Sequence, residues 1–161
     1  MSIVRGYLLA IGLLLVAFGV AYLIAPVPMA ALAGLDLPTS LALIEVRGFY
    51  GGQLVGLGGF ILLGVSKPRF VVPGLLLTAL SLGGTAFGRI VGILAAGSLP
   101  PMIIAALILE IAGSGVAVLL LNREHKVGAA THAAEAARRG LLPRERRCPT
   151  RSVVGSRVAA A

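Results

Sequence analysis

The first 121 residues are mostly apolar, and their few charged residues stand far apart. No charge occurs between Arg5 and Asp36, between Arg47 and Lys67, between Arg69 and Arg89, or between Arg89 and Glu110. A helix that crosses a bilayer needs roughly 20 consecutive apolar residues. The pattern therefore predicts four membrane-spanning helices, at about residues 7–25, 42–65, 71–96 and 101–121.

The predicted spans are apolar all round, unlike the amphipathic helices of a soluble core. Charged residues make up only 12% of the chain, against about 25% in ordinary soluble domains, so a soluble protein is the weaker interpretation. The first span also resembles a signal peptide, because Arg5 precedes it and Pro26–Ala30 follows it. It exceeds the roughly 7–15 apolar residues of a signal core. This favours a retained helix, ended by Pro26 and Pro28 and followed by a loop over 26–41.

Basic residues gather at one end of the predicted bundle. With four spans, Arg5, the turn Lys67–Arg69 and everything after Asn122 fall on the same side of the membrane. The first loop, on the other side, contains Asp36. The positive-inside rule then predicts a multi-pass protein of the cell (inner) membrane with both termini in the cytoplasm.

Residues 123–161 form a different region, rich in Ala, Arg, Gly, Pro and Ser. A short helix is expected at 130–139, closed by Gly140, and the rest has too little apolar surface to fold. The basic tail is thus predicted to be mostly disordered. Its charge suits an anionic lipid surface, and without interleaved aromatic residues it gives no reason to expect nucleic acid. Cys148, the single cysteine, is interpreted as an incidental thiol.

Glycines recur at intervals of four in the second and third spans. The predicted helix-packing residues are Gly48, Gly52, Gly56, Gly84, Gly88 and Gly92. Small residues at this spacing let helix backbones approach closely in lipid, so we expect the two spans to pack against each other through these runs. The alternative is that glycine is merely tolerated there. Membrane lipids are the expected partners, and a homo-oligomer is left open.

The predicted spans also carry polar side chains, which form the candidate cluster: Glu45, Arg47, Tyr50, Gln53, Arg89 and Glu110. Arg89 and Glu110 lie ten or eleven residues before and after the turn near residues 99 and 100. Antiparallel neighbouring helices would bring them to one depth. Because a charge within the bilayer needs a partner, we expect the two to form an ion pair with Arg47 close by.

Three interpretations fit this cluster. The simplest is an ion-pair network that only locks the helices together. The second is a polar pocket for an anionic headgroup or small molecule, and the third is a small proton-coupled transporter or transporter subunit using Glu110. A lipid-handling enzyme is a weaker alternative, since no histidine or cysteine occurs before residue 123 and no catalytic residue stands out. For the same reason we expect neither a metal nor a cofactor in the membrane part.

The same residues carry a resemblance to a known family. Glu45, Arg47, Gly48, Tyr50, Gly51 and Gly52, followed by Gly88-Arg89 and Glu110, resemble small bacterial four-helix membrane proteins grouped as domain of unknown function family 4345. The resemblance covers about residues 3–122 and implies four retained helices but no activity. The predicted fold is thus an all-α integral membrane four-helix bundle over residues 1–122, followed by a basic cytoplasmic tail over 123–161.

Overall fold

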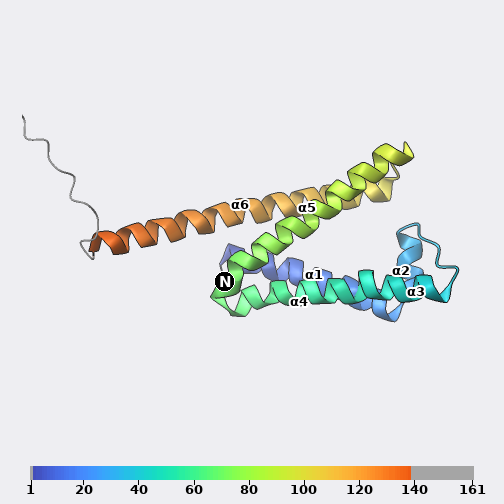
Figure 1. Ribbon diagram of the computed structural model, residues 1–161, viewed down its shortest axis with the longest axis horizontal. Helices are drawn as coiled ribbons and strands as arrows, with labels where there is room; N and C mark the ends of the chain where they lie inside the picture. Colours follow the sequence, from blue (N-terminus) through green and yellow to red (C-terminus); the bar gives the residue numbers. More distant parts are fainter. Residues whose placement is uncertain (1, 139–161) are drawn as a thin grey trace, which may run out of the picture. The chain divides into compact units, whose positions relative to one another are not determined.

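The computed structural model of the chain describes residues 2–138. The chain divides into two units, of which the first comprises Met1–Lys126. In chain order the elements are α1 (Ile3–Ile24), α2 (Pro26–Leu32), α3 (Ser40–Val46), the π-helix η1 (Arg47–Gly52), α4 (Gln53–Ser66), the 3-10 helix η2 (Pro68–Phe70), α5 (Val71–Ala96) and α6 (Pro101–Arg138) (Figure 1). The described residues contain no strand.

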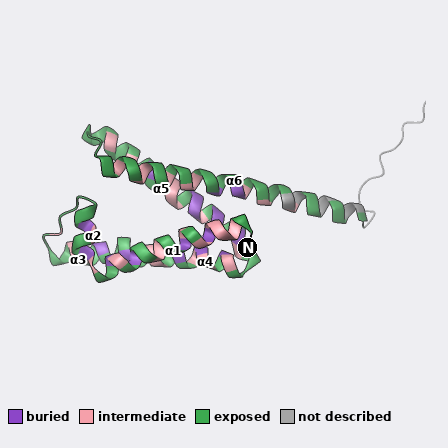
Figure 2. Ribbon diagram, turned by 180° about the vertical axis from the view of Figure 1, so that it is seen from behind, coloured by how far each residue is buried: buried purple, intermediate pink, exposed green. Residues whose placement is uncertain are grey.

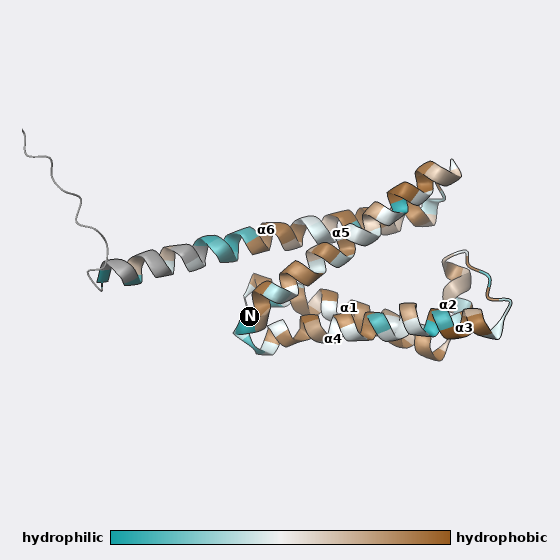
Figure 3. Cartoon of the chain, viewed as in Figure 1, coloured by the Kyte–Doolittle hydropathy of each residue, from teal (hydrophilic) through white to brown (hydrophobic). Residues whose placement is uncertain are grey.

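Four helical stretches are long and apolar enough to cross a membrane: Ile3–Ile24, Ser40–Ser66, Pro68–Ala96 and Pro101–Lys126. The second joins α3, η1 and α4, and the third joins η2 and α5. Apolar residues, coloured brown, predominate along α1, α4, α5 and the first part of α6 (Figure 3). The predicted all-α membrane bundle is therefore confirmed.

Much of this apolar surface faces outward. Leu80 on α5 and Leu109 and Leu119 on α6 are 66%, 72% and 65% exposed. Water would penalise so much exposed hydrocarbon, whereas the acyl chains of a bilayer match it. The outward leucines therefore agree with a protein that has lipid as its solvent.

Local sequence sets the ends of the helices. The Ser2 hydroxyl oxygen accepts a hydrogen bond from the Arg5 N–H at 3.4 Å, and the Thr39 hydroxyl oxygen accepts one from the Ala42 N–H at 3.2 Å. Each side chain thereby satisfies a backbone donor in the first turn of a helix. Gly97 ends α5 with a φ of 62°, a left-handed conformation that suits glycine.

The connection between the first two spans is not the simple loop predicted over 26–41. Pro26 follows α1 and begins α2, a helix of seven residues, because proline suits the first turn of a helix. The Tyr22 hydroxyl donates a hydrogen bond to the Met29 carbonyl at 3.3 Å. This contact and the complete burial of Ala30 hold α2 against the end of α1.

α1 and α4 run side by side and antiparallel (Figures 1 and 2). Glycines spaced by seven residues lie between them. Gly12 faces Gly58, and Gly19 faces Gly51. A Cβ added at Gly58 would lie 2.7 Å from the Gly12 carbonyl oxygen, and one at Gly19 would lie 2.8 Å from the Gly51 carbonyl oxygen. Only residues without a side chain allow backbones this close, so these glycines fix the register of the helix pair.

The buried core lies where α1 begins, α4 ends and α5 begins. Its members are Leu8, Ile61, Val71, Leu75 and Leu120. Most buried residues of α5 lie in its first half, whereas Phe87 and Leu94 are 69% and 77% exposed. α5 therefore leaves α1 and α4 as it runs toward Ala96 (Figures 1 and 2).

The glycine runs predicted to join the second and third spans do not do so. All six face open space rather than a neighbouring helix: Gly48, Gly52, Gly56, Gly84, Gly88 and Gly92. The nearest atom to an added Cβ is on the same second span, the Arg47 carbonyl oxygen 3.9 Å from Gly52, and the other five meet nothing within 4 Å. The prediction was wrong because α5 diverges from α4 at this level, while α4 and η1 use Gly58 and Gly51 to meet α1.

α6 continues beyond its membrane span to Arg138. The short helix predicted at 130–139 is therefore the end of α6 rather than an element of its own. The predicted disorder of the later tail and the single cysteine, Cys148, lie outside the described residues.

Candidate polar site within the membrane spans

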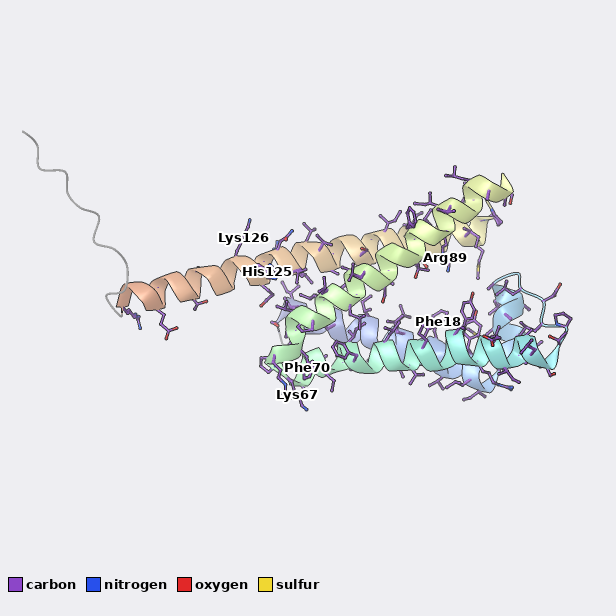
Figure 4. All side chains as sticks on the ribbon, viewed as in Figure 1. Phe18, Lys67, Phe70, Arg89, His125 and Lys126 are labelled. Atoms are coloured by element: carbon purple, nitrogen blue, oxygen red, sulfur yellow. The ribbon has the colours of Figure 1, made fainter. Side chains whose placement is uncertain are left out.

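Arg89 on α5 and Glu110 on α6 form an ion pair. The Arg89 Nε lies 2.9 Å from Oε1 and 3.0 Å from Oε2 of Glu110. The two side chains are 34% and 13% exposed, so the pair is partly buried rather than sealed. The predicted pairing of these two residues is present, and Figure 4 labels Arg89 on its helix.

The α5–α6 turn explains why the two charges meet. Arg89 lies eight residues before Gly97, and Glu110 lies nine residues after Pro101. At about 1.5 Å per residue, both charges sit roughly 12–14 Å from the turn. Since the hydrocarbon core is about 30 Å thick, this depth is close to the middle of a membrane.

The ion pair uses only part of the Arg89 guanidinium. Both carboxylate oxygens of Glu110 approach the same nitrogen, Nε. The strongest arginine–carboxylate pairs instead align two guanidinium N–H groups with two oxygens. Among the described residues, neither Nη group of Arg89 has a hydrogen-bond partner. Glu110 therefore balances the charge but leaves these donors unused.

A second group of polar side chains joins the end of α1 to η1. The Tyr22 and Tyr50 rings lie 5.2 Å apart between centroids, at an interplanar angle of 31°. The Arg47 Nε donates a hydrogen bond to the Leu23 carbonyl at 3.2 Å. These contacts hold the end of α1 against η1.

The π-helix η1 carries Arg47 and Tyr50. At its end, the Gln53 N–H bonds to the Gly48 carbonyl, five residues back instead of four. The segment is held on α1 at Leu23, because Arg47 bonds to that carbonyl and a Cβ at Gly51 would lie 2.7 Å from the Leu23 side chain. Such π-turns cost hydrogen-bond geometry and occur often at functional sites. Sequence spacing alone gave no sign of it.

The structure brings together only part of the predicted cluster. Glu45 and Gln53 are exposed, and within residues 2–138 neither side chain has a hydrogen bond or an ion pair. Arg47 pairs with a backbone carbonyl instead of a carboxylate. The geometric centre of the candidate site is therefore Arg89 with Glu110.

Two polar contacts that sequence reasoning missed fasten α6 to its neighbours. The Tyr7 hydroxyl donates a 2.6 Å hydrogen bond to the Gly113 carbonyl, and the Ser114 hydroxyl donates a 2.9 Å hydrogen bond to the Ala79 carbonyl. Ser114 stands between Gly113 and Gly115, where the sequence indicates only a run of small residues. Tyr7 lies in an apolar run, where nothing in the pattern separates it from a lipid-facing aromatic residue.

The described part of the chain contains no group of three His, Cys, Asp or Glu side chains able to hold a metal ion. The chemistry available at the candidate site is therefore that of the guanidinium, the carboxylate and the two phenols. These groups are chemically suited to charged or hydrogen-bonding ligands.

Four apolar spans and a partly buried ion pair define a small multi-pass membrane protein. The chain belongs to the family described as Domain of unknown function (DUF4345), whose sequence profile matches residues 3–121. The resemblance inferred from the motif is thereby confirmed. No curated protein and no solved structure matches the chain.

Proposed function

We propose that this protein is a membrane-embedded binding protein that holds the anionic group of a lipid or other amphiphile at Arg89. The observation that carries the proposal is the unused part of the guanidinium. Both oxygens of Glu110 are taken by Nε, and the side chain is 34% exposed. Arg89 therefore has Nη donors available at a position that a ligand can reach.

Unpaired Nη donors are energetically unfavourable in lipid. Transfer of a polar group from water to hydrocarbon without a hydrogen-bond partner costs roughly 2–7 kcal/mol of free energy. A phosphate, sulfate or carboxylate oxygen would satisfy the Nη groups and strengthen the charge balance. Arginine suits this role because its planar fork matches such groups in shape.

The incomplete pairing also argues against a purely structural role. A pair that only locked α5 to α6 would gain most from two guanidinium nitrogens bonded to the two carboxylate oxygens. The Arg89–Glu110 pair uses one nitrogen. Ionisable residues within membrane spans mark functional sites by default, and the incomplete pairing gives that expectation a specific form.

We expect Tyr50 to supply a surface for the apolar part of such a ligand. Its ring contacts the buried Tyr22 ring, and Tyr50 is 44% exposed. An amphiphile held at Arg89 would place its apolar part against this ring.

The proposed location is the cell (inner) membrane with both termini in the cytoplasm. Arg5, the turn Lys67–Arg69, Arg123 and Lys126 lie at one end of the spans, as the positive-inside rule requires of a cytoplasmic face. Arg89 is then reached from the half of the bilayer away from the cytoplasm. An amphiphile in that leaflet is the proposed source of ligand.

A titration with dodecyl phosphate tests the proposal. The protein would be purified in a maltoside detergent, and the rise in its melting temperature would be measured as dodecyl phosphate is added. Arg89→Gln should weaken binding by about tenfold or more, because it removes hydrogen bonds between the ligand and a charged group. Glu110→Gln should bind at least as tightly as the natural chain, because the competing carboxylate is gone.

Arg69→Gln provides the matched control, since it removes an arginine in the turn between α4 and α5. Its response to dodecyl phosphate should be that of the natural chain. A structural pair predicts instead that no variant changes the response. A proton carrier at Glu110 predicts proton uptake by reconstituted vesicles that Glu110→Gln abolishes, and this result would replace the binding proposal.

A further inference from the structure

A second candidate site lies at the opposite end of the spans from the α5–α6 turn. A hollow of about 330 Å³ is lined by Ser2, Arg5, Pro68, Val71, Val72 and Glu124, among others. These residues come from the start of the first span, the start of the third and the end of the fourth. Figure 4 labels Lys67 and Phe70 in the turn that leads to α5, and His125 and Lys126 on α6.

The hollow holds two opposite charges that do not neutralise each other. Arg5 and Glu124 both line it, and among the described residues neither side chain forms an ion pair or a side-chain hydrogen bond. A ligand with one sign of charge would meet repulsion from one of them. A ligand with a positive and a negative group would be attracted by both.

The depth of the hollow in the membrane indicates which class of ligand can reach it. Arg5 lies in the first turn of α1, Pro68 in the turn between two spans, and Glu124 near the end of the fourth span. These positions place the hollow where the headgroups of one leaflet lie. Molecules that carry both charges at this depth are zwitterionic phospholipids.

An apolar track leads from the hollow along α5. Val72 lines the hollow, and Leu76 and Leu80 follow it at intervals of four, so they share one face of the helix. The three side chains are 36%, 47% and 66% exposed. An acyl chain whose headgroup occupied the hollow would run along this track toward the middle of the bilayer.

We propose that the hollow binds a phospholipid whose headgroup carries a phosphate and a primary ammonium group. The Arg5 guanidinium holds the phosphate, and the Ser2 hydroxyl, which accepts the Arg5 N–H, still has its own proton to donate. The Glu124 carboxylate accepts N–H bonds from the ammonium. Phosphatidylethanolamine has this chemistry, whereas a trimethylammonium group has no N–H to donate and a glycerol headgroup has no positive charge.

Native mass spectrometry of the full chain in detergent tests the proposal. Retained lipid would be measured during titration with phosphatidylethanolamine, phosphatidylcholine and phosphatidylglycerol of identical acyl chains. The natural chain should bind phosphatidylethanolamine about tenfold more tightly than phosphatidylcholine. Only the former can donate a hydrogen bond to the Glu124 carboxylate, and a charged hydrogen bond accounts for a difference of this size. Equal affinity for these two lipids would overturn the proposal.

Two variants separate the roles of the charges. Glu124→Gln should remove the preference for phosphatidylethanolamine over phosphatidylcholine and should not weaken phosphatidylglycerol. Arg5→Gln should weaken all three lipids, and Arg5→Lys should restore part of the binding. If Glu124→Gln kept the preference, the assignment of the ammonium group would be wrong.

Lys126→Gln is the control for general attraction between basic residues and lipid, because Lys126 is exposed near the same end and does not line the hollow. Its lipid affinities should equal those of the natural chain. A loss as large as that of Arg5→Gln would show that net charge alone holds the lipid. Melting temperatures of all variants would show whether each is folded.

Discussion

Gly12 and Gly58 meet backbone to backbone, and their contact sets how closely α1 and α4 approach. A Cβ on Gly58 would lie 2.7 Å from the Gly12 carbonyl oxygen, and a Cβ on Gly12 would lie 3.2 Å from the Gly58 carbonyl oxygen. Gly19 and Gly51 repeat the relationship seven residues away on each helix. The pairing is antiparallel, so each glycine in one helix has one partner in the other.

Gly58→Ala should destabilise the bundle. The added methyl group meets a carbonyl oxygen and the Val16 side chain at 2.7 and 2.8 Å, so α1 and α4 must separate. We expect a loss of about 1–3 kcal/mol in the free energy of unfolding, as for other overpacked sites. The measurement is unfolding in mixed micelles with increasing sodium dodecyl sulfate, followed by circular dichroism.

The neighbouring residue gives the matched control. A Cβ at Gly59 would meet nothing within 4 Å, and alanine forms helix better than glycine. Gly59→Ala should therefore unfold at the same detergent fraction as the natural chain or a slightly higher one. Equal losses at the two positions would mean that the α1–α4 contact does not limit stability.

Tyr7→Phe removes one hydroxyl that ties α1 to α6. The hydroxyl donates a 2.6 Å hydrogen bond to the Gly113 carbonyl, and within membrane proteins such bonds contribute about 0.6 kcal/mol on average. We expect a loss of roughly 0.5–1.5 kcal/mol in the same unfolding measurement. Tyr50→Phe is the comparison, because the Tyr50 hydroxyl has no hydrogen bond within the described part of the chain. A cost at Tyr50 equal to that at Tyr7 would contradict the assigned contact.

The spans could be predicted from sequence because lipid imposes a simple rule on charge. Arg5 and Arg69 stand at the starts of spans, and the long uncharged stretches between charges match the helices observed. Which face of each helix packs inward could not be predicted in the same way. Gly52 and Gly58 both lie in one apolar span, and in lipid the outward face is as apolar as the inward face.

The Arg89–Glu110 pair was predictable for a different reason. A short turn makes α5 and α6 antiparallel, so equal distances from the turn give equal depth, and the cost of a lone charge demands a partner. No such rule covers Tyr22, whose role depends on how α2 folds back at Pro26. The bond from Arg47 to the Leu23 carbonyl was equally hidden, because it depends on the π-helix.

Removing residues 127–161 should leave the membrane unit folded. The core side chains and those packed against them all lie between Val4 and Leu121. A chain that stops after Lys126 keeps every one of them, and we expect its free energy of unfolding to change by no more than about 0.5 kcal/mol. The melting temperature and membrane insertion of the truncated chain would be compared with those of the full chain. Aggregation of the truncated chain alone would show that the tail has a structural role.

The last prediction concerns the coupling between Arg89 and Glu110. Glu110→Leu alone leaves the arginine uncompensated, which costs roughly 3–5 kcal/mol for a fully buried pair and less for this partly exposed one. Arg89→Leu together with Glu110→Leu should recover much of that loss, because neither charge remains. Arg47→Leu with Glu110→Leu is the control. The effects of these two substitutions should add, since Arg47 bonds to the Leu23 carbonyl and not to Glu110.

Free energies of unfolding measured in mixed micelles give the coupling energy of each pair of substitutions. Additive effects for Arg89 and Glu110 would mean that the ion pair contributes nothing to stability. Recovery of stability without recovery of the dodecyl phosphate response would separate the two roles, since the leucine pair can replace the packing of the ion pair but not its guanidinium.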